Sequence, residues 1–296
     1  MKNRHFLTSM HTHTNFCDGQ DDIETMCRAA YEKELVTIGF SSHAPITKKT
    51  GIKGDWFMKD ELIFEYADQV LAAKKRWKGK LEVLLGFEID YIKGLRSALD
   101  NDIKSINPDF LIGSVHFIIP ANGAQPFTVD GPIEEFTQGL NEGFNGDINA
   151  LMNCYYDALA EMITLGGFDI LGHADIIKKN RPSEWEQSNR QLAEIEACRQ
   201  EEILQIAKKN NIIAEVNTGG MNRGKISDVY PSLSFLRLFK EKNVPVIITS
   251  DAHKAEDLCG NYEYALKTLN NAGIKNHVII TGMNKQKIIW YLKELL

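Results

Sequence analysis

Phe6-Leu7-Thr8-Ser9-Met10-His11-Thr12-His13 is the stretch that decides the fold of this chain. It begins as a short, mainly apolar run typical of a buried β-strand, and it ends in two histidines separated by one residue. In extended backbone, residues i and i+2 point to the same side, so His11 and His13 can reach one pocket. The stretch therefore predicts a strand that carries two metal-binding side chains at its carboxyl end.

The same arrangement recurs along the chain. Six of the eight histidines lie in short clusters, most of which close an apolar run, and only His5 and His277 stand apart. A lone histidine after a strand is more often a packing residue than a ligand, but five strands that end in this way are hard to explain one by one. Histidine with carboxylate supplies both ligand types of a multinuclear metal site, which indicates a metal-dependent hydrolase. Asp18 follows His11-Thr12-His13. The further clusters are Ser41-Ser42-His43, Gly86-Phe87-Glu88, Gly113-Ser114-Val115-His116, Gly172-His173 and Ser250-Asp251-Ala252-His253.

Short apolar runs alternate with longer helical patterns, which is the order expected of a parallel sheet wrapped by helices. The runs are continuously apolar, which indicates burial on both faces, as in a closed parallel barrel. Barrel enzymes place their active sites at the carboxyl ends of the strands, where the histidine clusters fall. We expect strands at residues 6–10, 37–41, 81–87, 110–115, 168–171, 212–216, 244–249 and 278–280, and helices at 22–34, 61–77, 149–165, 184–210 and 232–242.

The segment from residue 120 to 147 is rich in glycine and proline. We interpret it as an excursion between strands, part of an inserted segment around residues 120–156 near the barrel mouth, where it could shape substrate choice. The chain has 296 residues, and α/β barrels of this length are often single domains. We therefore expect one domain spanning residues 1–296.

Composition limits the class of partner and the location. A net charge of −6 argues against broad affinity for nucleic acid, because proteins that bind it usually show a basic excess. The five cysteines are scattered without a paired metal spacing, which fits reduced thiols in the cytoplasm. The N-terminus has no apolar stretch long enough for a signal peptide, and no later stretch approaches a membrane span. We expect a cytoplasmic protein that binds neither nucleic acid nor a membrane.

The ligand types also predict the chemistry. Two close cations lower the pKa of a bridging water and offset charge on phosphoryl oxygens, so hydrolysis of a phosphomonoester is the natural reaction. No protein nucleophile is needed, and we interpret Cys17 and the serines of these clusters as strand-end or turn residues. Asp18 or a metal-bound water could protonate the leaving alkoxide. The candidate catalytic residues are Asp18, Glu88, Asp251 and His253.

At this point the motifs carry a family resemblance. His11-Thr12-His13, Asp18-Gly19, Ser42-His43, Gly86-Phe87-Glu88, Ser114-Val115-His116, Gly172-His173 and Ser250-Asp251-Ala252-His253 resemble, in this order, the motif series of the polymerase and histidinol phosphatase (PHP) superfamily. The resemblance runs from residue 11 to residue 253. Within the superfamily, the chain length, residues 145–156 and Asn180-Arg181-Pro182 are similar to histidinol-phosphatases of the PHP type.

The resemblance implies an α/β fold, a distorted single-domain (β/α)7 barrel, with two or three divalent metals at the carboxyl ends of the strands. Zinc, iron and manganese all suit imidazole with carboxylate. Many relatives have a histidine where this chain has Asp18, and an oxygen ligand there favours a harder ion. Carried onto this sequence, the first metal takes His11, His13, Glu88 and Asp251, the second takes Glu88 as a bridge with His116 and His173, and the third takes Asp18, His43 and His253.

A phosphomonoester bears close to two negative charges, which arginine binds in a forked geometry. The resemblance supports Arg181, in the loop after His173, and Arg223, after the glycine turn at Gly219-Gly220, as phosphate contacts. Asn217 could line the same mouth or could simply form a turn. Asp175 is a candidate partner of a metal ligand, and we expect Lys178 and Lys179 to be surface charges.

The implied reaction is hydrolysis of L-histidinol phosphate to L-histidinol and phosphate, a step of histidine biosynthesis, by a metal-bridging hydroxide. A second reading is a PHP-type phosphoesterase that acts on nucleotides or other phosphomonoesters. A third is a metal-binding module without catalysis, although such a module would be expected to lose ligands. The expected partner is a small phosphomonoester, and either a monomer or a small homo-oligomer fits the sequence.

Overall fold

The computed structural model describes residues 8–46, 50–181, 190–284 and 287–295 of the chain. The first two residues of the predicted strand at 6–10 and residues 184–189 of the predicted helix at 184–210 lie outside the described residues. No helix in the described part of the chain is both long and apolar enough to span a bilayer.

A seven-stranded parallel sheet forms the centre of the fold, in the order β1-β2-β3-β4-β7-β8-β9. Its strands fall on seven of the eight ranges expected from the apolar runs, so the predicted barrel-type α/β fold is confirmed. Neighbouring strands are parallel throughout this sheet. The strands are β1 (Thr8–Ser9), β2 (Thr37–Phe40), β3 (Glu82–Asp90), β4 (Phe110–Ser114), β7 (Ile170–Leu171), β8 (Ile213–Asn217) and β9 (Val246–Thr249).

The first and last strands of the sheet meet just beyond their carboxyl ends. Thr12 forms an isolated parallel bridge with Ala252. In this bridge the His13 N–H donates to the Ala252 carbonyl at 2.8 Å, and the Ala252 N–H donates to the His11 carbonyl at 3.2 Å. The sheet is therefore nearly closed into a barrel, and its seam lies directly beside two of the histidine motifs.

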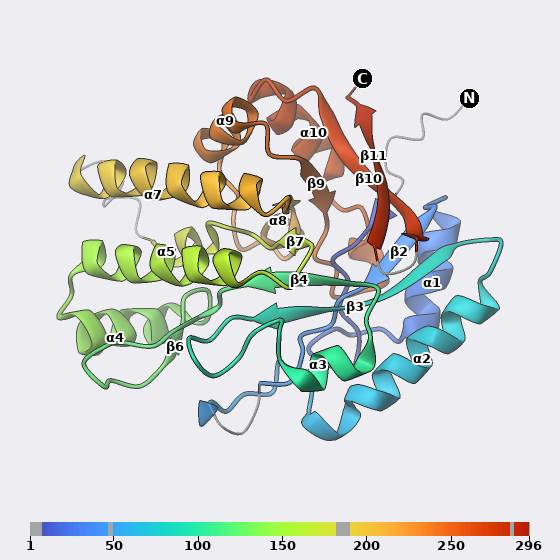
Figure 1. Ribbon diagram of the computed structural model, residues 1–296, viewed down its shortest axis with the longest axis horizontal. Helices are drawn as coiled ribbons and strands as arrows, with labels where there is room; N and C mark the ends of the chain where they lie inside the picture. The colour runs from blue at the N-terminus through green and yellow to red at the C-terminus, as the bar shows by residue number, and fades with distance from the viewer. Residues whose placement is uncertain (1–7, 47–49, 182–189, 285–286, 296) are drawn as a thin grey trace.

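Helices cover the outside of the barrel (Figure 1). Their apolar faces pack with the outward side chains of the strands in one large core, such as Tyr66 and Val70 of α2 with Val83 of β3. The α1 helix begins at a side-chain cap, where Asp22 accepts a hydrogen bond from the Thr25 N–H. The helices are α1 (Ile23–Glu32), α2 (Ile63–Arg76), α3 (Asn101–Ile106), α4 (Ile133–Phe144), α5 (Ile148–Leu165), α7 (Arg190–Lys209), α8 (Gly219–Asn222), α9 (Leu233–Lys242) and α10 (Tyr262–Asn271), with 3-10 turns η2 (Asp60–Leu62), η3 (Ile176–Asn180) and η4 (Ala255–Asp257).

The predicted eighth strand at 278–280 does not join the barrel. These residues belong to β10 (Asn276–Asn284), which pairs antiparallel with β11 (Lys287–Glu294). Val278 and Ile280 instead pack with inward side chains of the barrel strands, such as Leu84 and Ile247, in a separate apolar cluster. The hairpin therefore plugs the amino-terminal end of the barrel, opposite the end toward which the arrows of β3 and β4 point in Figure 1.

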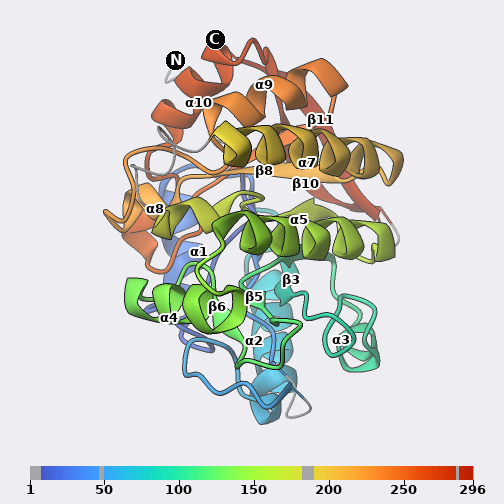
Figure 2. The same cartoon turned by 90° about the vertical axis from the view of Figure 1, so that its left-hand side faces the viewer.

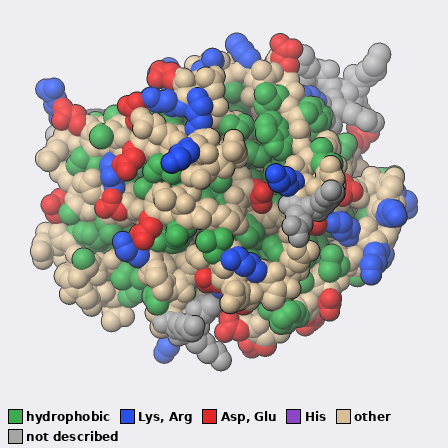
Figure 3. Space-filling model, viewed as in Figure 1, with side chains coloured by type: hydrophobic (Ala, Val, Ile, Leu, Met, Phe, Trp, Pro, Cys, Tyr) green, Lys and Arg blue, Asp and Glu red, His purple; other side chains and the backbone are tan. Residues whose placement is uncertain are grey.

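The outer strand of this hairpin is exposed. Trp290 and Leu292 of β11 keep 42% and 53% of their surface accessible, and apolar side chains are visible around the hairpin on the face in Figure 3.

The segment interpreted as an excursion between strands contains regular structure. It forms β6 (Phe127–Thr128), which pairs with β5 (Phe117–Ile118) just before the segment, and it forms the helix α4. Gly139 of α4 lies against Phe127, and a Cβ atom added there would come within 2.2 Å of the phenylalanine ring. The glycine that suggested a loop is thus a packing position in a helix. Figure 2 looks onto this end of the molecule, where α4, β5 and β6 face the viewer.

Candidate metal centre

The alternation of side chains along the barrel strands builds the site. In β8 and β9, Ile213 and Ile247 point inward in the apolar cluster that β10 plugs. Two residues further along each strand, Glu215 and Thr249 occupy the same face, because strand side chains repeat every second residue, and they are joined by a hydrogen bond of 2.6 Å. The barrel interior therefore changes from apolar to polar toward the carboxyl ends of its strands. Glu88 lies within β3, which extends past the predicted end at residue 87.

The structure brings all nine predicted metal ligands together at this end. They fall into overlapping groups whose ligand atoms lie within 4.8 Å of one another. Two groups match sets implied by the family resemblance, one with Glu88, His116 and His173 and one with Asp18, His43 and His253, which His13 also joins. The other groups are His11, His13 and Glu88, then His11, His173 and Asp251, and finally His43, Asp90 and His116. Their role as ligands stays a prediction.

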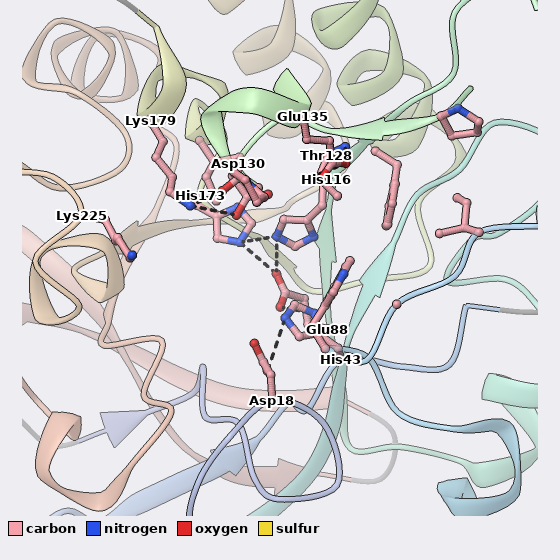
Figure 4. A pocket seen from close by; sticks show the side chains of 18 of the residues that line it. Asp18, His43, Glu88, His116, Thr128, Asp130, Glu135, His173, Lys179 and Lys225 are labelled. Atoms are coloured by element: carbon pink, nitrogen blue, oxygen red, sulfur yellow. Dashed lines mark hydrogen bonds and ion pairs between the residues drawn. The ribbon is translucent and has the colours of Figure 1, made fainter. Parts of the chain in front are cut away.

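Glu88 lies at the middle of the cluster (Figure 4). Its Oε2 atom is 3.1 Å from Nε2 of His11 and 3.0 Å from Nδ1 of His43. Its Oε1 atom is 2.9 Å from Nε2 of His173 and 3.7 Å from Nε2 of His116. Oε2 is also 3.5 Å from Nε2 of His13. Each carboxylate oxygen thus faces its own set of histidines, which is the geometry required of a bridging ligand.

Asp251 and Asp18 complete the side of the cluster next to the barrel seam. Oδ1 of Asp251 is 3.1 Å from Nε2 of His13 and 3.7 Å from Nε2 of His11. Oδ2 of Asp18 is 3.1 Å from Nε2 of His253. Asp18 is the more accessible carboxylate, with 32% of its side chain exposed, so it lies nearer to solvent.

Several of the atoms that could bind a metal have no hydrogen-bond partner. Nε2 of His11, Nε2 of His13, Nδ1 of His43 and Oε2 of Glu88 are buried and make no hydrogen bond. A buried polar atom without a partner is costly, and these four converge on one another. Divalent metal ions between them would satisfy all four atoms, so the residues present fit a metal centre.

Two further buried carboxylates hold the histidines in place. Oε1 of Glu215 accepts a hydrogen bond of 2.5 Å from Nδ1 of His11, and Oδ1 of Asp90 lies 2.7 Å from Nδ1 of His116. A carboxylate at one ring nitrogen fixes the tautomer and turns the other nitrogen toward the metal. Sequence reasoning assigned no role to these two residues, because nothing in their local pattern distinguishes them from other strand carboxylates.

The charges of the cluster are shaped by burial and by each other. Burial tends to raise the pKa of Glu88, but His11 and neighbouring histidines hold that pKa well below its usual range. Burial acts in the same way on Asp251, whose pKa Arg223 and His11 keep well below the usual range. Burial also lowers the pKa of His43 to about 4, despite the nearby carboxylates. At neutral pH the carboxylates are ionised and His43 is neutral, which are the forms that bind metal.

A pocket of about 850 Å³ opens over the cluster. Arg223 lines it and binds both the carbonyl oxygen and the carboxylate of Asp251 at 3.1 Å. Lys179, expected to be a surface charge, lines the same pocket, as does Lys225, which sequence reasoning missed. Figure 4 shows both lysines reaching toward the open space beside the metal ligands.

Arg181 lies elsewhere. Its guanidinium pairs with Glu196 of α7 at 2.7 Å, and Arg181 is not among the residues that line this pocket. Asn217 donates to Glu215 at 3.0 Å and to Asp251 at 3.3 Å, so it links these two carboxylates. Asp175 accepts from the Ser232 N–H and pairs with Lys178, and among the described residues it makes no hydrogen bond or ion pair with a predicted metal ligand. The function of Arg181 stays a prediction.

Comparison with known families and structures agrees with this geometry. The model of the PHP domain family matches residues 9–219. The chain belongs to the PHP domain family. The match includes the motifs from His11 to His173 and ends before Asp251 and His253, which the structure nonetheless brings into the same cluster of ligand-type side chains.

Curated relatives of this PHP protein span nearly its whole length. A probable histidinol-phosphatase of Deinococcus radiodurans is 26% identical over 268 residues, 90% of this chain and 94% of the relative. The histidinol-phosphatase of Bacillus subtilis is also 26% identical, over 87% of this chain and 97% of the relative. The predicted class, a PHP-type metal-dependent phosphatase, is thereby confirmed.

Solved structures confirm the fold. The putative histidinol phosphatase of Listeria monocytogenes superposes with a TM-score of 0.75 at 22% identity, covering 87% of this chain and 99% of that one. The histidinol phosphate phosphatase of Lactococcus lactis, solved with zinc, L-histidinol and phosphate, gives a TM-score of 0.66 at 18% identity, covering 96% and 98%.

Proposed function

We propose that this PHP protein is a histidinol-phosphatase, which hydrolyses L-histidinol phosphate to L-histidinol and phosphate. The observation that carries the proposal is the cluster of nine ligand-type side chains beneath a pocket lined by four cations, Lys53, Lys179, Arg223 and Lys225. The full-length relatives named histidinol-phosphatase support the substrate. The reaction would make the protein a cytoplasmic enzyme of histidine biosynthesis.

The cluster would hold two or three divalent ions, of zinc, iron or manganese. Bound there, they would supply a water of lowered pKa as the attacking group and offset charge on the phosphoryl oxygens. Glu88 would be the shared ligand of the cluster, which is supported by its two carboxylate oxygens facing different sets of histidines. Asp251 and His13 tie the cluster to the barrel seam.

Three of the four pocket cations, Lys179, Arg223 and Lys225, would bind the phosphate. Burial lowers the pKa of Lys179, and the neighbouring charges of Arg223 and Lys225 lower it further, against the effect of Asp130. Cations that repel one another in a pocket are stabilised when an anion binds between them. Arg223 holds Asp251 at the same time, so it links the phosphate position to the metal ligands.

The test is phosphate release from L-histidinol phosphate against a panel of sugar phosphates and nucleotides, with metal content measured on the same preparation. A strong preference for L-histidinol phosphate with at least two metals per chain supports the proposal. Equal or nucleotide-biased turnover with the same metal content would discard the substrate and keep the PHP phosphoesterase class. Tight metal uptake without release of phosphate from any ester would favour a binding module.

A further inference from the structure

The walls of the catalytic pocket carry charges of both signs. Lys225 lies on one side of the opening, and Glu135 lies beside Thr128 on another (Figure 4). Asp130 also lines the pocket. A phosphomonoester has close to two negative charges at neutral pH, so carboxylates in its pocket repel it unless the same molecule brings a positive charge. The two carboxylates therefore indicate a substrate with a cationic end.

Both carboxylates are half-buried and are held outside the metal cluster. Oε1 of Glu135 accepts hydrogen bonds from the Thr128 N–H at 2.7 Å and from the Thr128 hydroxyl at 3.0 Å. Oδ2 of Asp130 lies 4.0 Å from the Lys179 ammonium, which also donates to the Asp130 carbonyl oxygen. Because Glu135 is fixed through neutral donors, its negative charge is available to a ligand.

An aromatic wall adjoins these carboxylates. The rings of Trp56 and Phe117 stack with centroids 5.5 Å apart at an angle of 18°. Trp56 also meets the predicted metal ligand His43 edge-on, at 4.6 Å. Both aromatic residues line the pocket, and they belong to a small apolar cluster separate from the two barrel cores. Such a wall favours a flat ring, or a cation held over the indole face.

The same ribbon carries the aromatic wall and the anchor of Glu135. Phe117 of β5 pairs directly with Thr128 of β6. The pairing continues with the next residues, Val129 after Thr128 and His116 before Phe117. The Val129 N–H donates to the carbonyl oxygen of the predicted metal ligand His116 at 2.8 Å. The distance between the metal centre and these groups is therefore set by a hydrogen-bonded ribbon rather than by a long loop.

Building on the proposed function, we propose that Trp56, Phe117, Asp130 and Glu135 form a head-group subsite. This subsite binds the flat ring and the ammonium group of an amine-bearing phosphomonoester while the phosphate lies between the metal centre and the pocket cations. The carboxylates act twice, since they attract the amine and repel phosphomonoesters that lack one.

The test pairs two substrates that differ by one amine: L-histidinol phosphate and 3-(imidazol-4-yl)propyl phosphate. At pH 8 most imidazole is neutral, because its unperturbed pKa is about 6.5, so only the first substrate carries a cation. We expect Glu135→Gln and Asp130→Asn each to lower kcat/KM for L-histidinol phosphate by about 10- to 100-fold, the range for hydrogen bonds to charged groups. For the analogue without the amine, kcat/KM stays unchanged or rises.

The matched control is Glu134→Gln, which changes an exposed neighbour of Glu135 that does not line the pocket. It should leave kcat/KM for both substrates within about twofold. The aromatic wall is tested separately by Trp56→Leu, with propyl phosphate as a substrate without a ring. This change should lower kcat/KM by about 2- to 10-fold for both imidazole substrates and spare propyl phosphate.

A structural effect of these substitutions would lower kcat/KM for every substrate by the same factor, and that result would overturn the head-group subsite. A wild-type protein that does not distinguish the amine-bearing substrate from its analogue would overturn it as well. The proposed function fails in a different way, if the wild type prefers another phosphomonoester altogether. Opposite effects of Glu135→Gln on an amine-bearing substrate and its amine-free analogue would still support the subsite in that case.

Discussion

Glu215 illustrates how much the proposed metal centre depends on residues outside the predicted ligand set. It is buried and accepts four hydrogen bonds, from Nδ1 of His11, the Thr249 hydroxyl, the His173 N–H and the Asn217 amide. Two of these donors belong to predicted ligands that follow different strands, His11 after β1 and His173 after β7. Glu215 therefore fixes the ring of His11 and the backbone of His173 relative to each other.

We expect Glu215→Gln to weaken metal binding by about 10- to 100-fold, because the uncharged amide is a poorer partner for the imidazole N–H. The measurement is metal retention during competition with a chelator, followed by metal analysis. Glu241→Gln, at an exposed position of α9, is the control and should retain metal like the wild type. Unchanged retention in the Glu215 variant would contradict the positioning role.

At the residue scale, the predictable part of the site is the set of side chains that end apolar runs. His116 and His173 follow such runs, so strand geometry alone places them at one end of the barrel. Glu215 lies inside a strand, where a carboxylate has no local signal of its own. Trp56 and Lys225 come from irregular segments, and only the packing of those segments decides whether they face the pocket.

At the scale of elements, α4 fixes the ribbon that carries the head-group subsite. Its Gly139 lies against Phe127 of β6 with no room for a side chain. We expect Gly139→Val to lower the free energy of unfolding by about 1–3 kcal/mol, the usual cost of overpacking. The measurement is urea unfolding, combined with KM for the preferred substrate, which should rise because the ribbon shifts.

Thr137→Val is the matched control, because it introduces the same side chain at an exposed position of the same helix. Its free energy of unfolding should stay within about 0.5 kcal/mol of the wild type. Equal stability of the two variants would show that the contact between Gly139 and Phe127 can relax without cost.

The elements that sequence reasoning found and missed differ in a physical way. Strands and helices of the barrel bury one side or both, so their apolar patterns are strong. In α4, Gly139 and Gly143 lower helix propensity and suggest a loop, although both serve close packing against Phe127 and Pro120. In β11, the apolar run from Ile288 to Leu292 pairs with the predicted strand at 278–280. Most of its side chains are exposed, so it has no buried face that an apolar pattern could indicate.

At the scale of the whole molecule, the metal centre also joins the ends of the sheet. Within the residues that the structure describes, the seam between β1 and β9 has one bridge, Thr12 with Ala252, and predicted ligands flank that bridge on both sides. Ions held jointly by His13 and Asp251 would therefore hold the barrel closed. That residues 1–296 form one domain stays a prediction.

Removal of metal should accordingly destabilise the fold. A ligand present at about 100 times its Kd stabilises the folded state by about 3 kcal/mol, which corresponds to a fall in Tm of about 5–10 °C for a chain of this size. The measurement is thermal unfolding before and after chelation, with hydrogen exchange of the backbone amides. Exchange should rise first at Ala252 and His13. A uniform rise over the barrel would argue against a role at the seam.

The β10–β11 hairpin has a consequence for the order of events in turnover. Because Val278 and Ile280 fill the barrel from its amino-terminal end, ligands enter and leave on the side of the pocket. The phosphate would lie deepest, beneath the alcohol product, so the alcohol has to depart first. Inorganic phosphate should then compete with the substrate for free enzyme, whereas the alcohol should act as a noncompetitive inhibitor. Steady-state product inhibition would reveal this order of product release. The order would follow from the hairpin, which closes the far end of the barrel.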